Sequence, residues 1–232
     1  MWSGCATAPL QPELPPGPRV TAVVPAELPP LATNVMLGID VFEQQGFREL
    51  QGIRVGLLTH PAGVNRFGVS TLDVLHRDKR VNLVALFSVE HGIHRDIPAG
   101  EKYEDHRDAR TNLRVYSLYN GRTRSATPAQ LRNIDVLVID LQDIGTRSYT
   151  FVAAMLYQLD ACFQNQVEVI VLDRPNPLGG LKVSGPITDP EWIGYMASFR
   201  GPYVHGLTIG EIARMAASQA GRVKAVGGVR VR

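Results

Sequence analysis

The chain has 232 residues, of which 44% are hydrophobic and 20% are charged, enough to bury a sizeable core in one large domain or in one domain and part of another. Lys and Arg number 24 against 22 Asp and Glu, and the basic residues form no long block, so no nucleic-acid partner is expected. No run of about 18 apolar residues occurs that would span a membrane.

Residues 1–33 differ in composition from the rest of the chain. They contain eight prolines and almost no helical or strand periodicity, which predicts a tether. Residues 3–6 resemble the end of a bacterial lipoprotein signal, with Cys5 as the lipidated residue, although the apolar segment that should precede it is missing. A chance match and a membrane tether through Cys5 both stay open.

From Val35 onward, helical and strand patterns alternate. Apolar residues at helical spacing, caps and terminal glycines predict helices over 37–46, 69–77, from Pro128 after a cap at Thr127, 146–165 and 207–220. Short runs of bulky apolar residues predict extended segments over 53–59, 82–88, 113–119, 134–140 and 167–173. This alternation predicts an α/β fold with βαβ units and a doubly wound, mostly parallel sheet.

Two further expectations concern the organisation of the chain. Residues 34–222 are expected to form one domain, and residues 223–232 look like a beginning strand, with which a second, smaller domain would start. Cys162 falls on the apolar face of the predicted helix 146–165, which indicates a small core residue rather than one half of a disulfide.

Polar side chains follow each major strand of the predicted sheet. They are His60, then Glu90 and His91, then Asp140, Gln142 and Asp143, and finally Asp173, Arg174 and Asn176. Parallel strands end at the same edge of a sheet, where ligands bind in open α/β folds. Acids, histidines and an arginine gathered at one edge indicate a ligand site. Any single member could instead hold a turn, Asp143 and Asn176 in particular.

Glu90 is the centre of this predicted site. It lies at the end of a buried strand, beside an imidazole and beside Gly92, which lets the backbone turn. These are the parts needed for general acid–base chemistry. The long segment 93–112 is crowded with charge and has no apolar period. It is either a cover that excludes water from Glu90 or a solvated loop.

Other chemistries fit the sequence less well. His91 and His94 with Asp96 or Asp105 could bind a metal, but their spacing lacks the helical two-histidine signature, so no metal site is assigned. No G-x-G-x-x-G follows a strand and no G-x-S-x-G occurs, which disfavours a nicotinamide cofactor and a serine hydrolase. No cofactor is expected.

Several motifs together resemble the NamZ-like exo-β-N-acetylmuramidases, a family long known only as a domain of unknown function. In chain order they are Gly38-Ile-Asp40, Leu58-Thr-His60 with Gly63, Val89-Glu-His-Gly92, Ala99-Gly-Glu101, Val115-Tyr-Ser-Leu-Tyr119, Asp140-Leu-Gln-Asp-Ile-Gly145 with Arg147, Tyr149 and Thr150, Asp173-Arg-Pro-Asn-Pro-Leu-Gly-Gly180 and His205-Gly-Leu-Thr-Ile-Gly-Glu211. Each is weak alone, but the ordered set, over about residues 37–220, is highly specific.

The resemblance implies a Rossmann-like catalytic domain, a smaller second domain and an active site between them. It also implies release of terminal N-acetylmuramic acid from the non-reducing end of peptidoglycan fragments, by an extracytoplasmic protein of the periplasm or outer envelope whose partners are muramyl saccharides. The family's catalytic glutamate maps onto Glu90. Where the family usually reads Glu-Gly-Pro, this chain has Ser184-Gly-Pro186, and residues 195–204 also depart from the pattern.

The expected mechanism follows from these assignments. Glu90 would be the acid, with His91 and Asp140 as catalytic neighbours, and the substrate's 2-acetamido group would be the nucleophile, oriented by Asp143 or Asp140. Arg147 or Arg174 would bind the lactyl carboxylate. All the substrate-binding candidates are His60, Glu101, Gln142, Asp143, Arg147, Tyr149, Asp173, Arg174, Asn176 and His205.

Two alternatives to this enzyme stay open at this point. The serine at position 184 favours a lipoprotein that binds peptidoglycan fragments with impaired turnover, and the histidines of the charged segment leave room for a metal-dependent hydrolase.

Overall fold

A computed structural model describes residues 35–219 and 229–231 of the chain. The predicted tether with Cys5 lies outside the described residues. The helices are α1 (Gly38–Gln44), α2 (Thr71–Arg77), α3 (Pro128–Leu131), α4 (Thr150–Gln164) and α5 (Ile209–Gln219), with short 3₁₀ helices η1 (Arg48–Leu50) and η2 (Pro190–Trp192). None of the helices in these ranges is long and apolar enough to cross a membrane.

The described residues form a seven-stranded sheet in the order β3-β4-β2-β1-β5-β6-β7. The strands are β1 (Arg54–Thr59), β2 (Asn82–Ser88), β3 (His106–Arg107), β4 (Arg114–Ser117), β5 (Val136–Asp140), β6 (Glu168–Val171) and β7 (Val229–Val231). All neighbours are parallel except β3 and β4. From β1 the chain winds outward through β2 and β4, then crosses to the other side of β1 with β5. The predicted doubly wound, mostly parallel α/β fold is confirmed.

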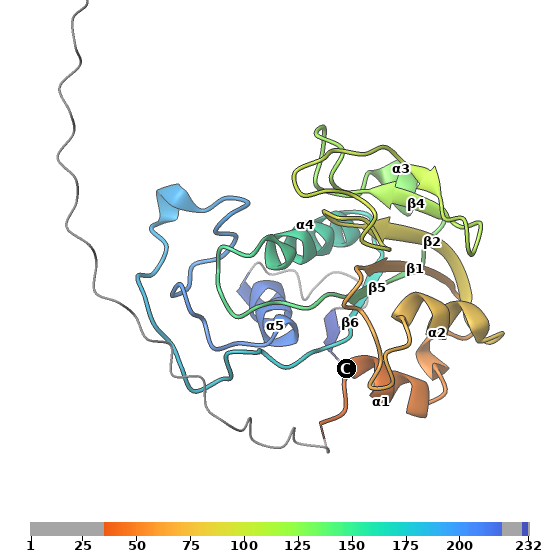
Figure 1. Ribbon diagram of the computed structural model, residues 1–232, viewed down its shortest axis with the longest axis horizontal. Coiled ribbons are helices and arrows are strands. Elements are labelled where there is room, and N and C mark those ends of the chain that lie inside the picture. Colours follow the sequence, from red (N-terminus) through yellow and green to blue (C-terminus); the bar gives the residue numbers. More distant parts are fainter. Residues whose placement is uncertain (1–34, 220–228, 232) are drawn as a thin grey trace, which may run out of the picture. The chain divides into compact units, whose positions relative to one another are not determined.

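Helices cover both faces of this sheet (Figure 1), with α1 and α2 against one face and α4 and α5 against the other. Successive residues of a strand point to opposite faces. Leu57 therefore packs in the cluster of α1 and α2, whereas Leu58 packs in the cluster of α4 and α5. Because both faces are buried, the strands read as continuous apolar runs rather than alternating ones.

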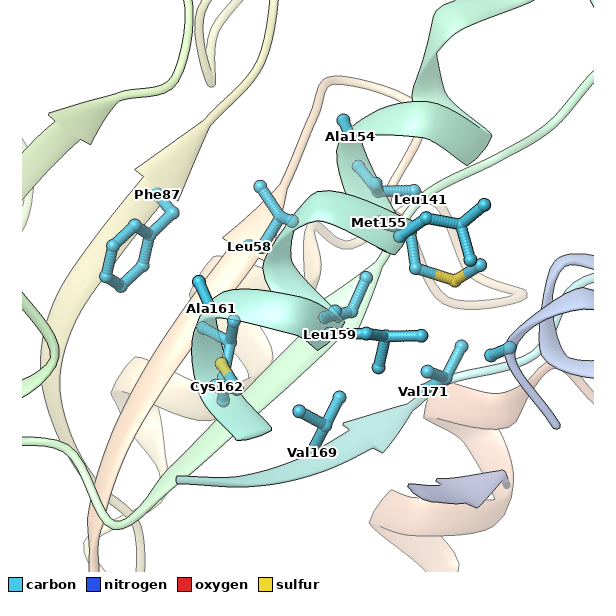
Figure 2. Packing of buried hydrophobic residues seen from close by; sticks show 14 of the residues in the cluster. Leu58, Phe87, Leu141, Ala154, Met155, Leu159, Ala161, Cys162, Val169 and Val171 are labelled. Atoms are coloured by element: carbon cyan, nitrogen blue, oxygen red, sulfur yellow. The ribbon is translucent and has the colours of Figure 1, made fainter. Parts of the chain in front are cut away.

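Helix α4 is the main element of the larger core. Its inward face carries Met155, Leu159 and Cys162, all with 0% exposure, and Figure 2 shows them along α4, in one cluster with the sheet residues Leu58 and Val169. The core position predicted for Cys162 is confirmed. Burial raises the pKa of its thiol to about 12, which keeps it protonated and unreactive.

Most elements match their predicted ranges, and the differences have local causes. The helix predicted over 146–165 begins only at Thr150, because Thr146 forms a bridge with Val204 and the Arg147 N–H donates to the Tyr203 carbonyl group. The cap predicted at Thr127 is confirmed by a capping box with Gln130.

The strand β7 lies within the segment where we expected a second domain to start. Residues 229–231 pair with β6 in parallel and extend the same sheet, whereas residues 223–228 and 232 lie outside the described residues.

The core can be tested at Leu159, the buried centre of α4. Replacing Leu159 with Ala removes packed methyl groups and leaves a cavity, so the free energy of unfolding should fall by about 2–5 kcal/mol in urea denaturation. The matched control is Leu181→Ala at a fully exposed position, which should change it by less than about 0.5 kcal/mol. Equal effects of the two changes would contradict the packing described for α4.

Candidate functional site

The carboxyl ends of the three central strands are level with one another. Thr59, at the end of β1, pairs with Ser88 of β2 on one side and with Asp140 of β5 on the other. The loops that follow these strands therefore start at one place on the sheet edge. This place is the switch point, where the chain order reverses and α/β sheets open a crevice for ligands.

An open pocket of about 280 Å³ lies at this edge, with Glu90 as the one carboxylate among its described lining residues. The lining residues are His60, Pro61, Ala62, Glu90, His91, Arg95, Tyr149 and Phe151. Glu90 is half-buried, and its Oε1 accepts a hydrogen bond of 2.8 Å from the Gly100 N–H. The hydrogen bonds of the described residues leave Oε2 free to meet a ligand.

His60 forms another wall of the pocket. Its Nε2 accepts a hydrogen bond of 2.9 Å from the Gln142 N–H, which links the loops after β1 and β5. Burial, with a smaller contribution from the positive charge of Arg174, lowers the pKa of His60 to about 4. The imidazole is therefore neutral at physiological pH, with its proton on Nδ1 as a donor. The ring also packs edge-on against Phe151, at 4.8 Å between centroids.

His91 has an unusual backbone conformation. Its φ is +74°, in the left-handed region, and the following Gly92 N–H closes a turn onto the Val89 carbonyl group. Such a conformation in a residue other than glycine is sparsely populated and is often found at functional sites. The ring Nδ1 lies 3.2 Å from the Ile97 carbonyl oxygen, so His91 holds the start of the next loop.

The charged segment 93–112 is docked onto the sheet beside Glu90. The Tyr103 hydroxyl donates to the Val89 carbonyl group over 2.6 Å and also hydrogen-bonds to Ser88. His94 pairs with the buried Asp108 at 2.6 Å. The segment therefore lies beside Glu90, most of its residues are exposed, and Arg95 is its residue in the pocket lining. In the described ranges, no group of three or more His, Cys, Asp or Glu side chains could hold a metal ion.

Asp140 and Arg174 correct the prediction, because they pair with each other beneath the pocket. Asp140 is 0% exposed, and its two oxygens accept hydrogen bonds of 2.5 and 2.8 Å from Nε and Nη2 of Arg174. Thr71 donates to the same carboxylate, and Arg174 also donates to the Val64 carbonyl group. Arg174 is therefore not available to a substrate carboxylate, and Asp140 does not line the pocket.

Asp173 and Asn176 make structural contacts, and neither lines the pocket of Glu90. Asp173 accepts hydrogen bonds from the Gly210 N–H and from the Thr208 hydroxyl, both at 2.8 Å, and so anchors the start of α5. Asn176 donates to the Leu207 carbonyl group over 2.9 Å. Asn176 therefore holds a turn, which was its simpler interpretation.

Gln142 and Glu101 are poorly placed for the predicted contacts. The Gln142 side chain donates to the carbonyl groups of Asp143 and Pro175, so it fixes the backbone behind the pocket. Glu101 is exposed and does not line the pocket of Glu90. Among the described residues, no hydrogen bond or ion pair joins either side chain to Glu90.

Arg147 supports the segment that leads back to α5. Its Nη1 donates to the carbonyl groups of Pro186, over 2.8 Å, and Gly201, over 2.5 Å. Its guanidinium carbon also lies 5.9 Å from the Tyr203 ring centroid. Among the described carboxylates none pairs with Arg147, so its charge stays open to an anionic ligand.

Asp143 and His205 form a second buried polar pair. His205 Nδ1 accepts from the Leu207 N–H, which leaves the proton on Nε2, 3.1 Å from Asp143 Oδ2 but outside hydrogen-bond geometry. Asp143 Oδ2 also accepts from the Gly145 N–H, whereas its buried Oδ1 has no partner among the described residues. A buried carboxylate oxygen without a donor is unusual in a folded protein.

Tyr149 connects this pair with the pocket. Burial raises the pKa of its hydroxyl, and the negative charges of Asp143 and Glu90 raise it further. The Tyr149 hydroxyl, which lines the pocket, is thus affected by the charges of both Asp143 and Glu90. Phe151 and Arg95 also line the pocket but were not predicted to do so. Phe151 has the spacing of an ordinary helix core residue, and Arg95 lies in a segment with many other charged residues.

These features define an α/β protein with a glutamate-containing pocket at the switch point of a doubly wound sheet. Residues 55–227 match the family model described as "Exo-beta-N-acetylmuramidase NamZ, N-terminal", and the chain belongs to this family. It is 42% identical over 182 residues to the peptidoglycan beta-N-acetylmuramidase NamZ of Bacillus subtilis (strain 168), covering 78% of this chain and 44% of that protein.

Two crystal structures of DUF1343 family proteins from Bacteroides fragilis NCTC 9343 have similar folds. One superposes with a TM-score of 0.77 at 44% identity and the other with a TM-score of 0.71 at 29% identity. Each match covers 84% of this chain, and 49% and 50% of the respective structures. The chain thus spans about half the length of these relatives.

Replacing Arg174 with Ala tests its structural role. The change leaves the buried Asp140 carboxylate without its partner, and the free energy of unfolding should fall by about 3–5 kcal/mol in urea denaturation. The control Arg80→Ala removes an exposed pairing with Asp78 and should have a much smaller effect. An Arg174→Ala protein of unchanged stability would show that the guanidinium group is available for a ligand after all.

The pKa of His60 predicts a pH dependence of stability. Between about pH 6.5 and the folded-state pKa of about 4, the unfolded chain binds a proton at His60 that the folded chain does not. The free energy of unfolding should therefore decrease by about 3 kcal/mol in total as the pH falls through this window. Urea denaturation between about pH 7 and about pH 4.5 gives the free energy of unfolding at each pH. Its decrease with falling pH should be smaller for His60→Gln than for the wild-type protein. Identical slopes would contradict the assignment.

Proposed function

We propose that this protein is a glycoside hydrolase that releases terminal N-acetylmuramic acid from the non-reducing end of peptidoglycan fragments. Family membership and the 42% identity to a peptidoglycan beta-N-acetylmuramidase support the class of reaction. The observation that carries the proposal is the position of Glu90, the one carboxylate among the described lining residues of the switch-point pocket. An extracytoplasmic location, where peptidoglycan lies, is part of the same proposal.

In the first step, Glu90 acts as general acid. Its carboxyl group gives a proton to the glycosidic oxygen while the bond from that oxygen to the anomeric carbon breaks. The Gly100 N–H holds one oxygen of Glu90 and leaves the other for the substrate. The neutral His60 supplies an N–H donor in the same pocket, because its low pKa keeps the ring uncharged.

The positive charge that develops at the anomeric carbon is met by the substrate itself. The carbonyl oxygen of the 2-acetamido group attacks this carbon and forms a cyclic intermediate, a known alternative to a second enzymatic carboxylate. Neither Asp143 nor Asp140 lines the pocket, but Asp143 is the better candidate to accept the acetamide N–H, because its Oδ1 lacks a partner among the described residues whereas both oxygens of Asp140 are bound by Arg174. Water then opens the intermediate at the anomeric carbon and returns its proton to Glu90.

This route is compatible with Ser184. Ser184 exchanges two backbone hydrogen bonds with Val204, of 3.0 and 2.8 Å, so the segment keeps its β-bridge without the family's usual glutamate. Because the acetamide supplies the nucleophile, turnover does not depend on a carboxylate at position 184.

The central test is Glu90→Gln. Removing the general acid should lower kcat/KM for a chromogenic N-acetylmuramic acid glycoside by about 10²–10⁴-fold, measured as release of the coloured aglycone. The fold should stay intact in circular dichroism, because the glutamine oxygen can still accept from the Gly100 N–H.

The matched control is Glu43→Gln, the same chemical change at an exposed position in α1, which should leave turnover unchanged. Unchanged turnover in Glu90→Gln would rule out the assignment of the acid. If the wild-type protein binds muramyl fragments but forms no product, the alternative hypothesis of a peptidoglycan-fragment-binding protein is correct instead.

A further inference from the structure

A second pocket, of about 310 Å³, is built from cations and aromatic rings. Its lining residues are Lys102, Tyr119, Gly121, Arg122, Thr123, Arg124, Ser125 and Tyr157, and none of them is acidic. Sequence analysis assigned no role to the basic residues of this set. Arg122 pairs with the exposed Glu104, which leaves Lys102 and Arg124 as the cations of this pocket with no carboxylate partner in the described ranges.

Arg124 is held in place, but one of its guanidinium nitrogens lacks an acceptor among the described residues. Its guanidinium carbon lies 3.8 Å from the ring centroid of Tyr195 and 4.9 Å from that of Tyr119. The buried Gln158 fixes the backbone on either side, donating to the Arg124 carbonyl group and accepting from the Ala126 N–H, both over 2.8 Å. Yet the buried Nη1 of Arg124 has no hydrogen-bond partner among the described residues. Such a buried, charged donor is costly unless a ligand supplies the acceptor.

Lys102 lines the same pocket as Arg124 and lies close to Gly121. A Cβ atom at Gly121, whose φ is +80°, would lie 2.6 Å from Cδ and 3.1 Å from Nζ of Lys102. Glycine at position 121 therefore suits both the left-handed backbone and the lysine that lies across this loop. The result is a pair of cations on two different segments that converge on one pocket, an arrangement suited to a carboxylate.

The basic pocket and the Glu90 pocket have no described lining residue in common, but the chain links them. Lys102 follows by two residues Gly100, whose N–H holds Glu90, and two residues span at most about 7 Å. Tyr195, on whose ring Arg124 stacks, also lies close enough to Glu90 to be affected by its charge: burial raises the pKa of the Tyr195 hydroxyl, Arg124 lowers it, and the negative charge of Glu90 raises it. Lys102 and Tyr195 thus connect the basic pocket with the pocket in which a sugar would meet Glu90.

We infer that Arg124 and Lys102 recognise the lactyl carboxylate of N-acetylmuramic acid. This inference rests on the proposed function and deepens it, because the lactyl ether is what distinguishes muramic acid from glucosamine. It replaces both earlier candidates, because Arg174 is committed to Asp140 and Arg147, which does not line the Glu90 pocket, donates to the carbonyl groups of Pro186 and Gly201. A stacked guanidinium group and an ammonium group bind a carboxylate more strongly than they bind a neutral hydroxyl group.

Binding rather than turnover tests this inference. In the Glu90→Gln background, calorimetry should show that N-acetylmuramic acid binds more tightly than N-acetylglucosamine. Arg124→Met and the exposed Lys102→Met should each weaken N-acetylmuramic acid by about 10- to 100-fold and leave N-acetylglucosamine unchanged. Arg80→Met, which removes the same charge far along the chain, is the matched control and should change neither affinity.

The outcomes separate the inference from the proposed function. Equal affinity for both sugars, or no loss in Lys102→Met, whose exposed side chain does not put folding at risk, would overturn the inference. In muramyl dipeptide the lactyl carboxylate is converted to an amide. Its affinity for both variants should therefore equal its affinity for the Glu90→Gln protein without the second change. Loss of its binding in Arg124→Met would assign the pocket to the stem peptide and also overturn the inference. Absence of turnover in the unchanged protein would instead defeat the proposed hydrolase.

Discussion

The common register of β1, β2 and β5 is the constraint on which the site depends. Parallel hydrogen bonding sets Thr59 level with Ser88 and Asp140, so three loops begin at one point of the sheet edge. A slip of β2 by one residue would turn Phe87 to the opposite face and move Glu90 away from the pocket. The two apolar clusters prevent such a slip, because each has its own set of alternate strand residues.

The buried ion pair of Asp140 and Arg174 lies beneath the pocket, and its two groups are not available to a ligand. Asp140 ends a fully buried strand, and a charge there is tolerated only with a partner of good geometry. Arg174 provides that partner and ties the end of β5 to the loop after β6. Its positive charge also helps to keep His60 neutral. The Asp140–Arg174 pair is therefore fixed, and at the site the described residues leave Glu90 Oε2 and Asp143 Oδ1 without a donor.

Much of the fold could be predicted from the sequence, because apolar runs and helical periodicity follow directly from burial. The doubly wound sheet, the cap at Thr127 and the core position of Cys162 are of this kind. The meeting of His60 with the loop after β5 could also be predicted, since it requires only that parallel strands end together.

The partners of charged side chains could not be predicted in the same way. Asp140 and Arg174 are 34 residues apart and read as two independent ligands, although they satisfy each other. Arg124 was overlooked for the opposite reason, since its importance depends on two rings from distant segments. Residue type and spacing predict where a charge lies on the fold, whereas its availability depends on the side chains packed around it.

The left-handed backbone at His91 has a consequence for the variation that this turn tolerates. Glycine, asparagine and aspartate adopt such angles at small cost, whereas valine, isoleucine or threonine would strain the chain one residue after the acid. A relative or a designed variant with a β-branched residue at this position must therefore rebuild the turn and re-aim its glutamate. The side chain at position 91 is thus a simple diagnostic of whether a remote homologue retains this geometry.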